Sequence, residues 1–166
     1  MLRKYGKFKL VRSLFKINTK NISFIDKIKI LYRPLICPYD DILEIIDGNE
    51  SFLDIGCGNG QFLYLLNEFL KPSYLSGIEI SEKLVKQANE ILSNNKNLFQ
   101  KIDIIKYDGY NIPQQIKKVD VITCIDVIHH IPKQKQIDYI NNLFKSVPEN
   151  TILIIKDIEG KSMLKY

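Results

Sequence analysis

The stretch Ser51 to Gly60, which reads SFLDIGCGNG, constrains the fold more than any other part of the sequence. It begins as a short apolar run bounded by turn-forming residues, the pattern of a buried β-strand. It ends in three glycines at alternate positions, Gly56, Gly58 and Gly60. Apolar residues then recur at helical spacing, so the sequence predicts a strand, a glycine-rich turn and an amphipathic helix. The apolar positions of that helix are Phe62, Leu63, Leu65, Leu66, Phe69 and Leu70.

A glycine-rich turn between a strand and a helix can hold a nucleotide-like ligand. Glycine adopts backbone angles that a Cβ forbids and allows close approach, while the N–H groups at a helix start attract negative charge. The dinucleotide fingerprint G-x-G-x-x-G requires glycine where this chain has Gln61. The observed G-x-G-x-G spacing therefore disfavours a nicotinamide-dependent oxidoreductase. A glycine turn that binds nothing remains the ordinary alternative for this motif alone.

The rest of the chain repeats the alternation of strand, turn and helix. Further strands are expected at residues 74–80, 102–107, 119–125 and 151–155, and helices at residues 39–46, after Ser81 as an N-cap, and at 134–147. Such alternation predicts the α/β class, a three-layer, doubly wound parallel sheet with helices on both faces. Ligands in such folds bind at the carboxyl ends of the strands.

Acidic residues stand at the ends of two of the predicted strands. Glu79 ends the second strand, where a carboxylate can accept hydrogen bonds from both hydroxyls of a ribose. Asp108 ends the third strand, directly before Gly109. Each has an ordinary alternative, a solvated acid for Glu79 and a turn aspartate for Asp108. Their positions at consecutive strand ends favour ligand binding.

Together, these motifs resemble those of the class I S-adenosylmethionine-dependent methyltransferases, over residues 38–157. DIGCGNG resembles the first family motif, whose loop cradles the amino-acid end of the cofactor, and GIEIS resembles the second. KYDGYNIP resembles the motif whose aspartate binds the adenine amino group. The resemblance implies S-adenosyl-L-methionine as the cofactor. The cofactor-binding residues that it implies are Asp54, Gly56, Cys57, Gly58, Gly60, Glu79, Ile80, Asp108, Gly109 and Cys124.

The segment VDVITCIDVIHHIP resembles the fourth-strand region of the small-molecule branch of this family. The family often presents a small residue to the cofactor at the position of Cys124, although a buried apolar cysteine is the alternative. Asp126, His129 and His130 are candidates for a catalytic base, since an acceptor hydroxyl would have to lose its proton. The resemblance does not identify a base, and Asp126 could instead cap a helix. The lack of an N-P-P-Y-like string counts against methylation of adenine or of glutamine amides.

The resemblance also predicts how the fold ends. The family order 3-2-1-4-5 is usually followed by a closing antiparallel strand pair, whereas this chain stops at Tyr166, so we expect a fold shortened at the C-terminus. The predicted function is methyl transfer from S-adenosylmethionine to a small-molecule or lipid-like acceptor. The alternative is a truncated cofactor-binding or interaction module without transferase activity. An unpaired fifth strand also predicts self-association, unless the N-terminal segment covers that edge.

The first 33 residues form a basic arm with ten lysines and arginines and a single acid, Asp26. We expect residues 1–37 to be a separate arm with two short amphipathic helices, and residues 38–166 to be the cofactor-binding domain. The arm could contact an anionic membrane or pack over the domain as a lid, with a solvated basic face as the ordinary alternative. Nucleic acid is not favoured as a partner.

The cysteine pattern indicates neither a metal site nor a disulfide framework. Cys37, Cys57 and Cys124 are scattered, with no C-x-x-C pair, and fit free thiols in a reducing compartment. No apolar run approaches membrane-spanning length, and three basic residues interrupt the apolar positions of residues 8–17, unlike a signal peptide. The sequence therefore predicts a cytoplasmic protein that is at most peripheral to a membrane.

Overall fold

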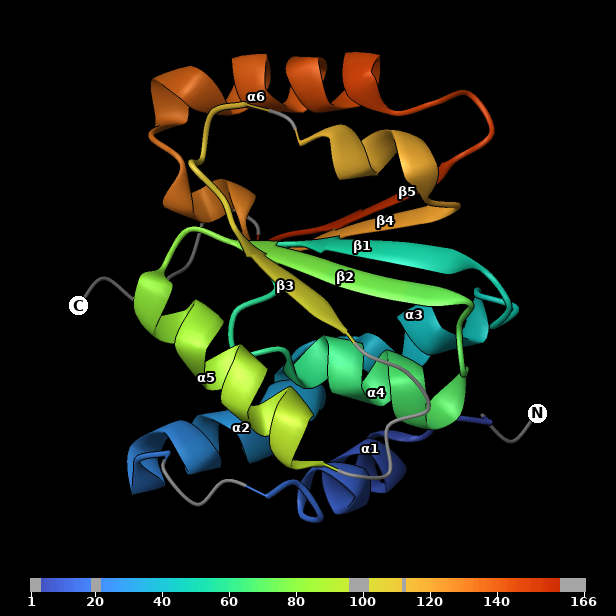
Figure 1. The fold of residues 1–166 in the computed structure, drawn as a ribbon, viewed down its shortest axis with the longest axis vertical. Coiled ribbons are helices and arrows are strands. Elements are labelled where there is room, and N and C mark those ends of the chain that lie inside the picture. Colours follow the sequence, from blue (N-terminus) through green and yellow to red (C-terminus); the bar gives the residue numbers. More distant parts are fainter. Residues whose placement is uncertain (1–3, 19–21, 96–101, 112, 159–166) are drawn as a thin grey trace.

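In the computed structural model of the chain, five strands form one sheet with helices on both faces (Figure 1). The structure describes residues 4–18, 22–95, 102–111 and 113–158. The strands lie in the order β3-β2-β1-β4-β5 and every pairing among them is parallel, which confirms the predicted fold class and strand order. Their bounds are Ser51–Ile55 (β1), Tyr74–Glu79 (β2), Asp103–Lys106 (β3), Val121–Ile125 (β4) and Ile152–Lys156 (β5).

The helices divide between the two faces of the sheet. One face is covered by α6 and by the short 3-10 helix η1, and the other by the remaining α-helices (Figure 1). A second 3-10 helix, η2, follows β4. The bounds are Lys7–Leu14 (α1), Phe24–Ile36 (α2), Tyr39–Glu44 (α3), Gln61–Phe69 (α4), Glu82–Asn94 (α5), Gln114–Lys118 (η1), Ile128–His130 (η2) and Lys133–Ser146 (α6).

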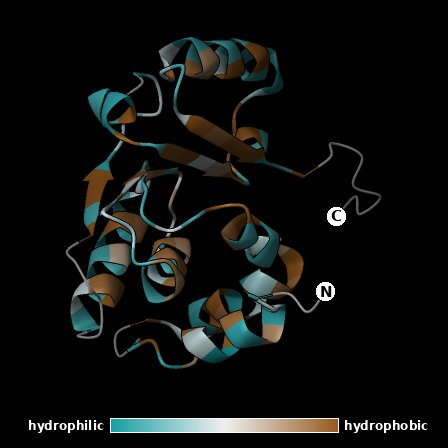
Figure 2. Cartoon of the chain, turned by 90° about the vertical axis from the view of Figure 1, so that its right-hand side faces the viewer, coloured by the Kyte–Doolittle hydropathy of each residue, from teal (hydrophilic) through white to brown (hydrophobic). Residues whose placement is uncertain are grey.

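The central strand β1 explains the three layers. Because successive side chains of a strand point to opposite faces, Phe52 packs into the core beneath α4, while Leu53 and Ile55 pack into the core beneath α6. All three side chains are almost fully buried. A strand buried on both faces needs a continuous apolar sequence, as in parallel sheets generally. The strands are accordingly mostly brown in Figure 2, whereas the helices carry both teal and brown.

The helix after β2 begins where the sequence predicts. The Ser81 hydroxyl oxygen accepts the backbone N–H of Leu84 at 3.4 Å, which makes Ser81 the N-cap of α5. The apolar positions Leu84, Val85, Ala88, Ile91 and Leu92 predict the buried face of this helix; the last three are buried, whereas Leu84 and Val85 are only partly buried. For Leu84, the reason is that it lines the cavities at the strand ends.

The basic arm folds onto the rest of the chain. Helix α1 packs against α2, α3 and α4, and its Leu10 and Leu14 belong to the same apolar core as Leu63. Helix α2 has 13 residues and continues through Pro34, which lies inside its last turns. The separation of an arm from a domain at residue 37 stays a prediction.

The fifth strand lies at an edge of the sheet. Within the described part of the chain, β5 pairs with β4 alone, and neither α1 nor α2 covers its outer side. The expected alternative, an arm folded back over this edge, is therefore wrong for the described residues. Residues 159–166 lie outside the described part of the chain. None of the helices in the described ranges has the length and apolar character needed to cross a membrane.

Candidate functional site

Two adjoining cavities open at the carboxyl ends of the strands. The first, of about 220 Å³, is called the polar cavity here, and the second, of about 330 Å³, the apolar cavity. They share Gly56 and Gly58 of the glycine loop as lining residues. The site lies where ligands of doubly wound sheets bind, beside the central strand at which the strand order reverses.

The glycine loop follows β1 and turns back over β2. The backbone N–H groups of Gly56 and Cys57 both donate to the carbonyl oxygen of Ile78, at 2.8 and 3.1 Å. Gly56, Gly58 and Gly60 all have positive φ, the conformation that favours glycine. A Cβ added at Gly58 would meet no atom within 4 Å, so the space beside this residue is open to a ligand.

Glu79 links the end of β2 to the glycine loop. One carboxylate oxygen accepts the backbone N–H of Gly58 at 3.0 Å, and the other accepts the N–H of Ser81 at 2.8 Å. The side chain is only 6% exposed and lines the apolar cavity. Each carboxylate oxygen has two lone pairs, so Glu79 retains acceptor capacity for a bound ligand.

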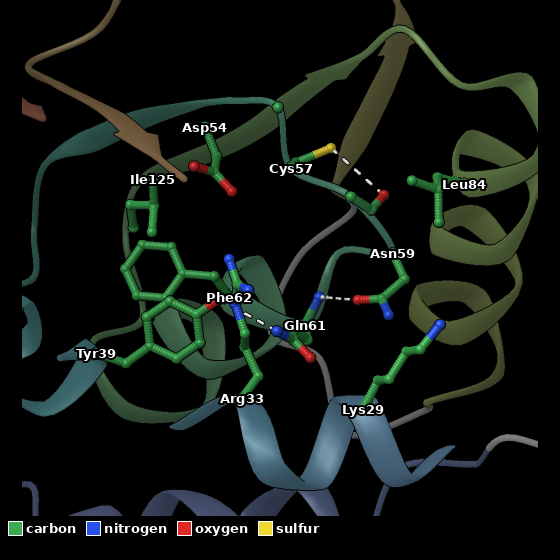
Figure 3. A pocket seen from close by; sticks show the side chains of 12 residues that line it. Lys29, Arg33, Tyr39, Asp54, Cys57, Asn59, Gln61, Phe62, Leu84 and Ile125 are labelled. Carbon is green, nitrogen blue, oxygen red and sulfur yellow. Dashed lines mark hydrogen bonds between the residues drawn. The ribbon is translucent and has the colours of Figure 1, made fainter. Parts of the chain in front are cut away.

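Asp54 is a buried carboxyl at the end of β1 that faces the polar cavity (Figure 3). Burial raises its pKa to about 7, opposed by a hydrogen bond from the Thr123 hydroxyl at 2.6 Å. The nearby negative charge of Glu79 raises the pKa further. Near neutral pH, this carboxyl therefore changes its protonation state readily, and a cation in the cavity would favour its charged form.

The basic arm supplies two cations to the polar cavity. Lys29 and Arg33 extend from α2 toward the glycine loop, as Figure 3 shows. Arg33 donates to a carboxylate oxygen of Asp126 at 2.5 Å, and Lys156 of β5 donates to the other oxygen at 2.5 Å. Sequence reasoning missed Arg33 and Lys156, although the lid alternative for the arm pointed in this direction.

Tyr39 and Gln61 form the floor of the polar cavity (Figure 3). The Gln61 side-chain amide donates to the Tyr39 hydroxyl at 3.1 Å, and the Tyr39 ring stacks on Phe62. Gln61 is only 8% exposed, and its side-chain carbonyl oxygen has no hydrogen-bond partner among the described residues. A buried acceptor without a partner is costly, so a ligand donor at this position would be stabilised.

The three candidate bases have different surroundings. Asp126 has a positive φ, and its carboxylate is engaged by Arg33 and Lys156, so it caps no helix.

Asp157 takes the capping role instead, because its carboxylate accepts the Ile128 N–H at 2.6 Å where η2 begins. The same carboxylate lies 2.7 Å from Nδ1 of His129. His130 is the histidine of the pair that lines the apolar cavity.

Asp126, His129 and Asp157 also bring possible metal-ligating atoms within 4.8 Å of one another. Both carboxylates already have partners, namely two cations at Asp126 and backbone N–H groups at Asp157. A further cation beside Arg33 would be repelled. The group therefore supports no metal assignment.

Of the remaining predicted site residues, Ile80 and Gly109 line a described cavity, whereas Asp108 and Cys124 do not. Ile80 and Gly109 line the apolar cavity. Asp108 is exposed and lines neither cavity, because its carboxylate accepts the backbone N–H groups of Tyr110 and Asn111 at 2.8 and 3.0 Å. Cys124 is fully buried within β4. Their roles in cofactor binding stay predictions.

A comparison with known families identifies the chain. A family model described as a methyltransferase domain matches residues 46–165, which include all five strands and the glycine loop. The chain belongs to this methyltransferase family. The predicted membership is thereby confirmed, and the family match begins just before β1.

Individual relatives agree with this assignment. A tRNA (guanine-N(7)-)-methyltransferase of Prochlorococcus marinus is 32% identical over 118 residues, covering 63% of this chain and 54% of the relative. The plantazolicin methyltransferase BpumL, solved with a pentazolic desmethylPZN analog and SAH, is 26% identical with a TM-score of 0.58, covering 92% of this chain and 58% of its own. A methyltransferase of Aquifex aeolicus has a TM-score of 0.67 at 18% identity, and the match covers 98% of this chain and 78% of the Aquifex chain. The chain spans only 4% to 54% of the curated relatives it matches.

The buried Asp54 predicts a pH-dependent stability. The unfolded chain ionises this group near its ordinary pKa of 3.8, whereas the folded chain keeps the proton up to about pH 7, so the unfolded state binds fewer protons in between. The free energy of unfolding should therefore fall as the pH rises from about 4 to 7. Asp54→Asn should flatten this fall, by at most about 4 kcal/mol, in denaturant titrations. Asp138→Asn, at an exposed position on α6, is the control, and equal slopes in both variants would contradict the prediction.

The ion pair between Arg33 and Asp126 predicts that one side chain holds α2 over the site. Arg33→Gln should loosen α2 and raise amide exchange in residues 24–36, with a loss of about 1 to 2 kcal/mol because Lys156 still pairs with Asp126. Hydrogen-exchange mass spectrometry measures this change. Arg12→Gln, at an exposed position on α1, should leave α2 unchanged. Equal exchange in the Arg33 variant and the parent protein would show that packing alone holds the helix.

Proposed function

We propose that this chain binds S-adenosyl-L-methionine and transfers its methyl group to a small-molecule or lipid-like acceptor. The observation that carries the proposal is the open glycine loop, whose Gly58 N–H is held by Glu79 at the carboxyl end of the neighbouring strand. A loop with this spacing leaves its backbone exposed to a ligand, and Glu79 stands where a ribose would need an acceptor.

The two cavities fit the two ends of the cofactor. Glu79, Ile80 and Gly109 would hold the nucleoside end in the apolar cavity, and Asp54, Lys29 and Arg33 would meet the charged amino-acid end. The carboxyl of Asp54 suits an ammonium group, the two cations suit a carboxylate, and the unpartnered oxygen of Gln61 suits a further donor. In this proposal, residues 38–166 form the binding domain and residues 1–37 an arm that completes the site.

The bound cofactor would supply an activated methyl group on a sulfonium centre. The chain's own residues would chiefly orient the two reactants and exclude water, since alignment accounts for much of the rate in such a transfer. Lys29 and Arg33 would border the polar cavity from the arm side, and Tyr39 would line it from α3. His130 would be the candidate to accept an acceptor's proton, because it lines the apolar cavity.

An apolar wall supports a small or lipid-like acceptor. Tyr107, Ile131 and Tyr139 line the apolar cavity together with Val127, so an acceptor that enters beside the bound nucleoside would meet an apolar surface. The acceptors named for the relatives differ, since one is a tRNA and BpumL was solved with a desmethylPZN analog. The rival proposal is a module that binds the cofactor without transferring the methyl group.

Calorimetric titration tests the cofactor assignment. The protein should bind S-adenosylmethionine and S-adenosylhomocysteine but not NAD, because Gln61 occupies the third glycine position of the dinucleotide fingerprint. Glu79→Ala should weaken binding by about 1.5 to 3 kcal/mol through the loss of charge-assisted hydrogen bonds. Glu82→Ala, at an exposed acid in the first turn of α5, is the matched control.

The outcomes separate binding from transfer. Unchanged affinity in a folded Glu79→Ala protein, checked by thermal melting, would reject the role of Glu79. Binding without methyl transfer to any compound in a metabolite extract would favour the binding module over the enzyme. Binding of NAD in preference to both sulfur compounds would overturn the proposed function.

The uncovered edge of β5 supports a second proposal, that the chain self-associates through this strand. Ile152 is half-exposed on this edge, whereas Ile154 packs partly against the core, so a charge at Ile152 disturbs the edge and spares the core. Light scattering should detect oligomers that Ile152→Lys reduces. Ile137→Lys on α6 is the control. A protein that stays monomeric at high concentration would contradict self-association.

A membrane contact by the basic arm is likewise a proposal. In and just after α1, Lys7, Lys9 and Lys16 are sequence neighbours of the exposed aromatic residues Phe8 and Phe15. This combination suits an anionic lipid surface.

A further inference from the structure

Helix α2 is apolar on two sides. Its inner side, with Ile30 and Pro34, is buried against the rest of the chain. Its outer side carries six more large apolar residues, all exposed: Phe24, Ile25, Ile28, Tyr32, Leu35 and Ile36. At about 100° per residue, these six positions fall on one arc of about 120°, which we call the outer stripe.

The outer stripe is unusually exposed. Phe24 and Ile36, at its two ends, are 75% and 72% exposed, and Tyr32 between them is 61% exposed. Single exposed apolar residues are normal on protein surfaces, but a contiguous row of six along one helix is rare unless it marks an interaction site. No segment in the described part of the chain covers this row. The stripe therefore needs an occupant that this part of the chain does not supply.

Positive charges surround the stripe. Lys27 and Lys29 flank the stripe on its two sides. Viewed down the helix axis, Lys27 lies about 60° from one limit of the arc of about 120° and Lys29 about 20° from the other. The neighbouring α1 exposes Phe8 and Phe15 in the same alternation of aromatic and basic residues. Among the described residues of the arm, the cations are Lys4, Lys7, Lys9, Arg12, Lys16, Lys27, Lys29 and Arg33, and Asp26 is the acid.

We propose that the outer stripe of α2, together with Phe8 and Phe15 of α1, docks onto an anionic lipid surface. Apolar side chains would enter the boundary between headgroups and acyl chains, while the flanking lysines would meet the anionic headgroups, as in interfacial amphipathic helices. Each cation near such a surface adds to the attraction. A second copy of this chain fits less well, because two arms of this composition would bring like charges together.

The same helix borders the polar cavity. Lys29 and Arg33 line that cavity on the side of α2 next to the stripe, so a docked lipid surface would lie beside the cavity opening. A lipid-dissolved acceptor could then reach the site without crossing bulk water. This consequence rests on the proposed methyl transfer, whereas docking itself does not.

Vesicle flotation of the full chain without cofactor tests the docking. The protein should float with phosphatidylglycerol vesicles at 0.1 M salt, but not with phosphatidylcholine vesicles and not at 0.5 M salt, because screening weakens the charge attraction. The variant Phe24→Ser with Ile36→Ser should reduce the partition coefficient by about tenfold or more. Both positions are exposed, so folding should be retained. Ile137→Ser with Phe144→Ser, at exposed positions on α6, is the matched control.

A charge variant tests the electrostatic part separately. Arg12→Gln with Lys16→Gln should weaken flotation by about tenfold or more, since each cation near an anionic surface contributes about 1 kcal/mol. Lys117→Gln with Lys118→Gln, at exposed positions of η1, removes the same charge elsewhere and should have little effect. Equal losses in the two charge variants would mean that net charge alone attracts the protein, which would overturn the assigned surface.

Three further results would also overturn the proposal. The first is no flotation of the folded parent protein with anionic vesicles. The second is unchanged flotation of the Phe24 and Ile36 variant. The third is an oligomer in the absence of lipid that this variant abolishes, because the stripe would then be a protein interface. Cofactor titration of the same variant should be unchanged, so failure of docking and failure of the proposed function are distinguishable.

Discussion

The site depends on how closely the glycine loop approaches β2. A Cβ added at Gly77 of β2 would lie 2.7 Å from both the Cys57 sulfur and a Leu63 methyl carbon, closer than real Cβ atoms come. This contact lets the loop lie directly over the strand, where Ile78 accepts two of the loop's N–H groups. The loop is held by its hydrogen bonds to Ile78 and Glu79, and the space beside Gly58 stays open. The geometry of the candidate site thus depends on glycine at position 77 of the neighbouring strand β2.

Charge is arranged in two separate groups around this loop. Asp54 and Glu79 lie close enough for the charge of Glu79 to raise the pKa of Asp54, and burial has the larger effect. On the arm side, Arg33 and Lys156 neutralise Asp126. The polar cavity itself is lined by Asp54 and by the cations Lys29 and Arg33, so a ligand with both a positive and a negative group would find a partner of opposite charge for each. The local charges therefore favour a zwitterionic group in the polar cavity, independently of any family resemblance.

Helix α2 connects the site to the outer surface. Its buried residues join the apolar core, Arg33 reaches the site, and the outer stripe faces away from the core. A helix that is apolar nearly all round is ordinarily found inside a protein. Here charged residues occupy two edges of the helix, Lys27 on one and Asp26, Lys29 and Arg33 on the other. The same helix can therefore take part in folding, in ligand binding and in contact with a surface.

The sequence by itself determined the local elements and their order. Glycine spacing, apolar periodicity and the Ser81 cap are properties of adjacent residues, so the strand order and the loop could be predicted from them and from the resemblance. Only the tertiary structure brought Arg33 to Asp126, 93 positions away, and gave the capping of η2 to Asp157 rather than to Asp126. It also enclosed Cys124 within β4. Such contacts depend on where separate elements meet in space, and no local pattern in the sequence encodes that position.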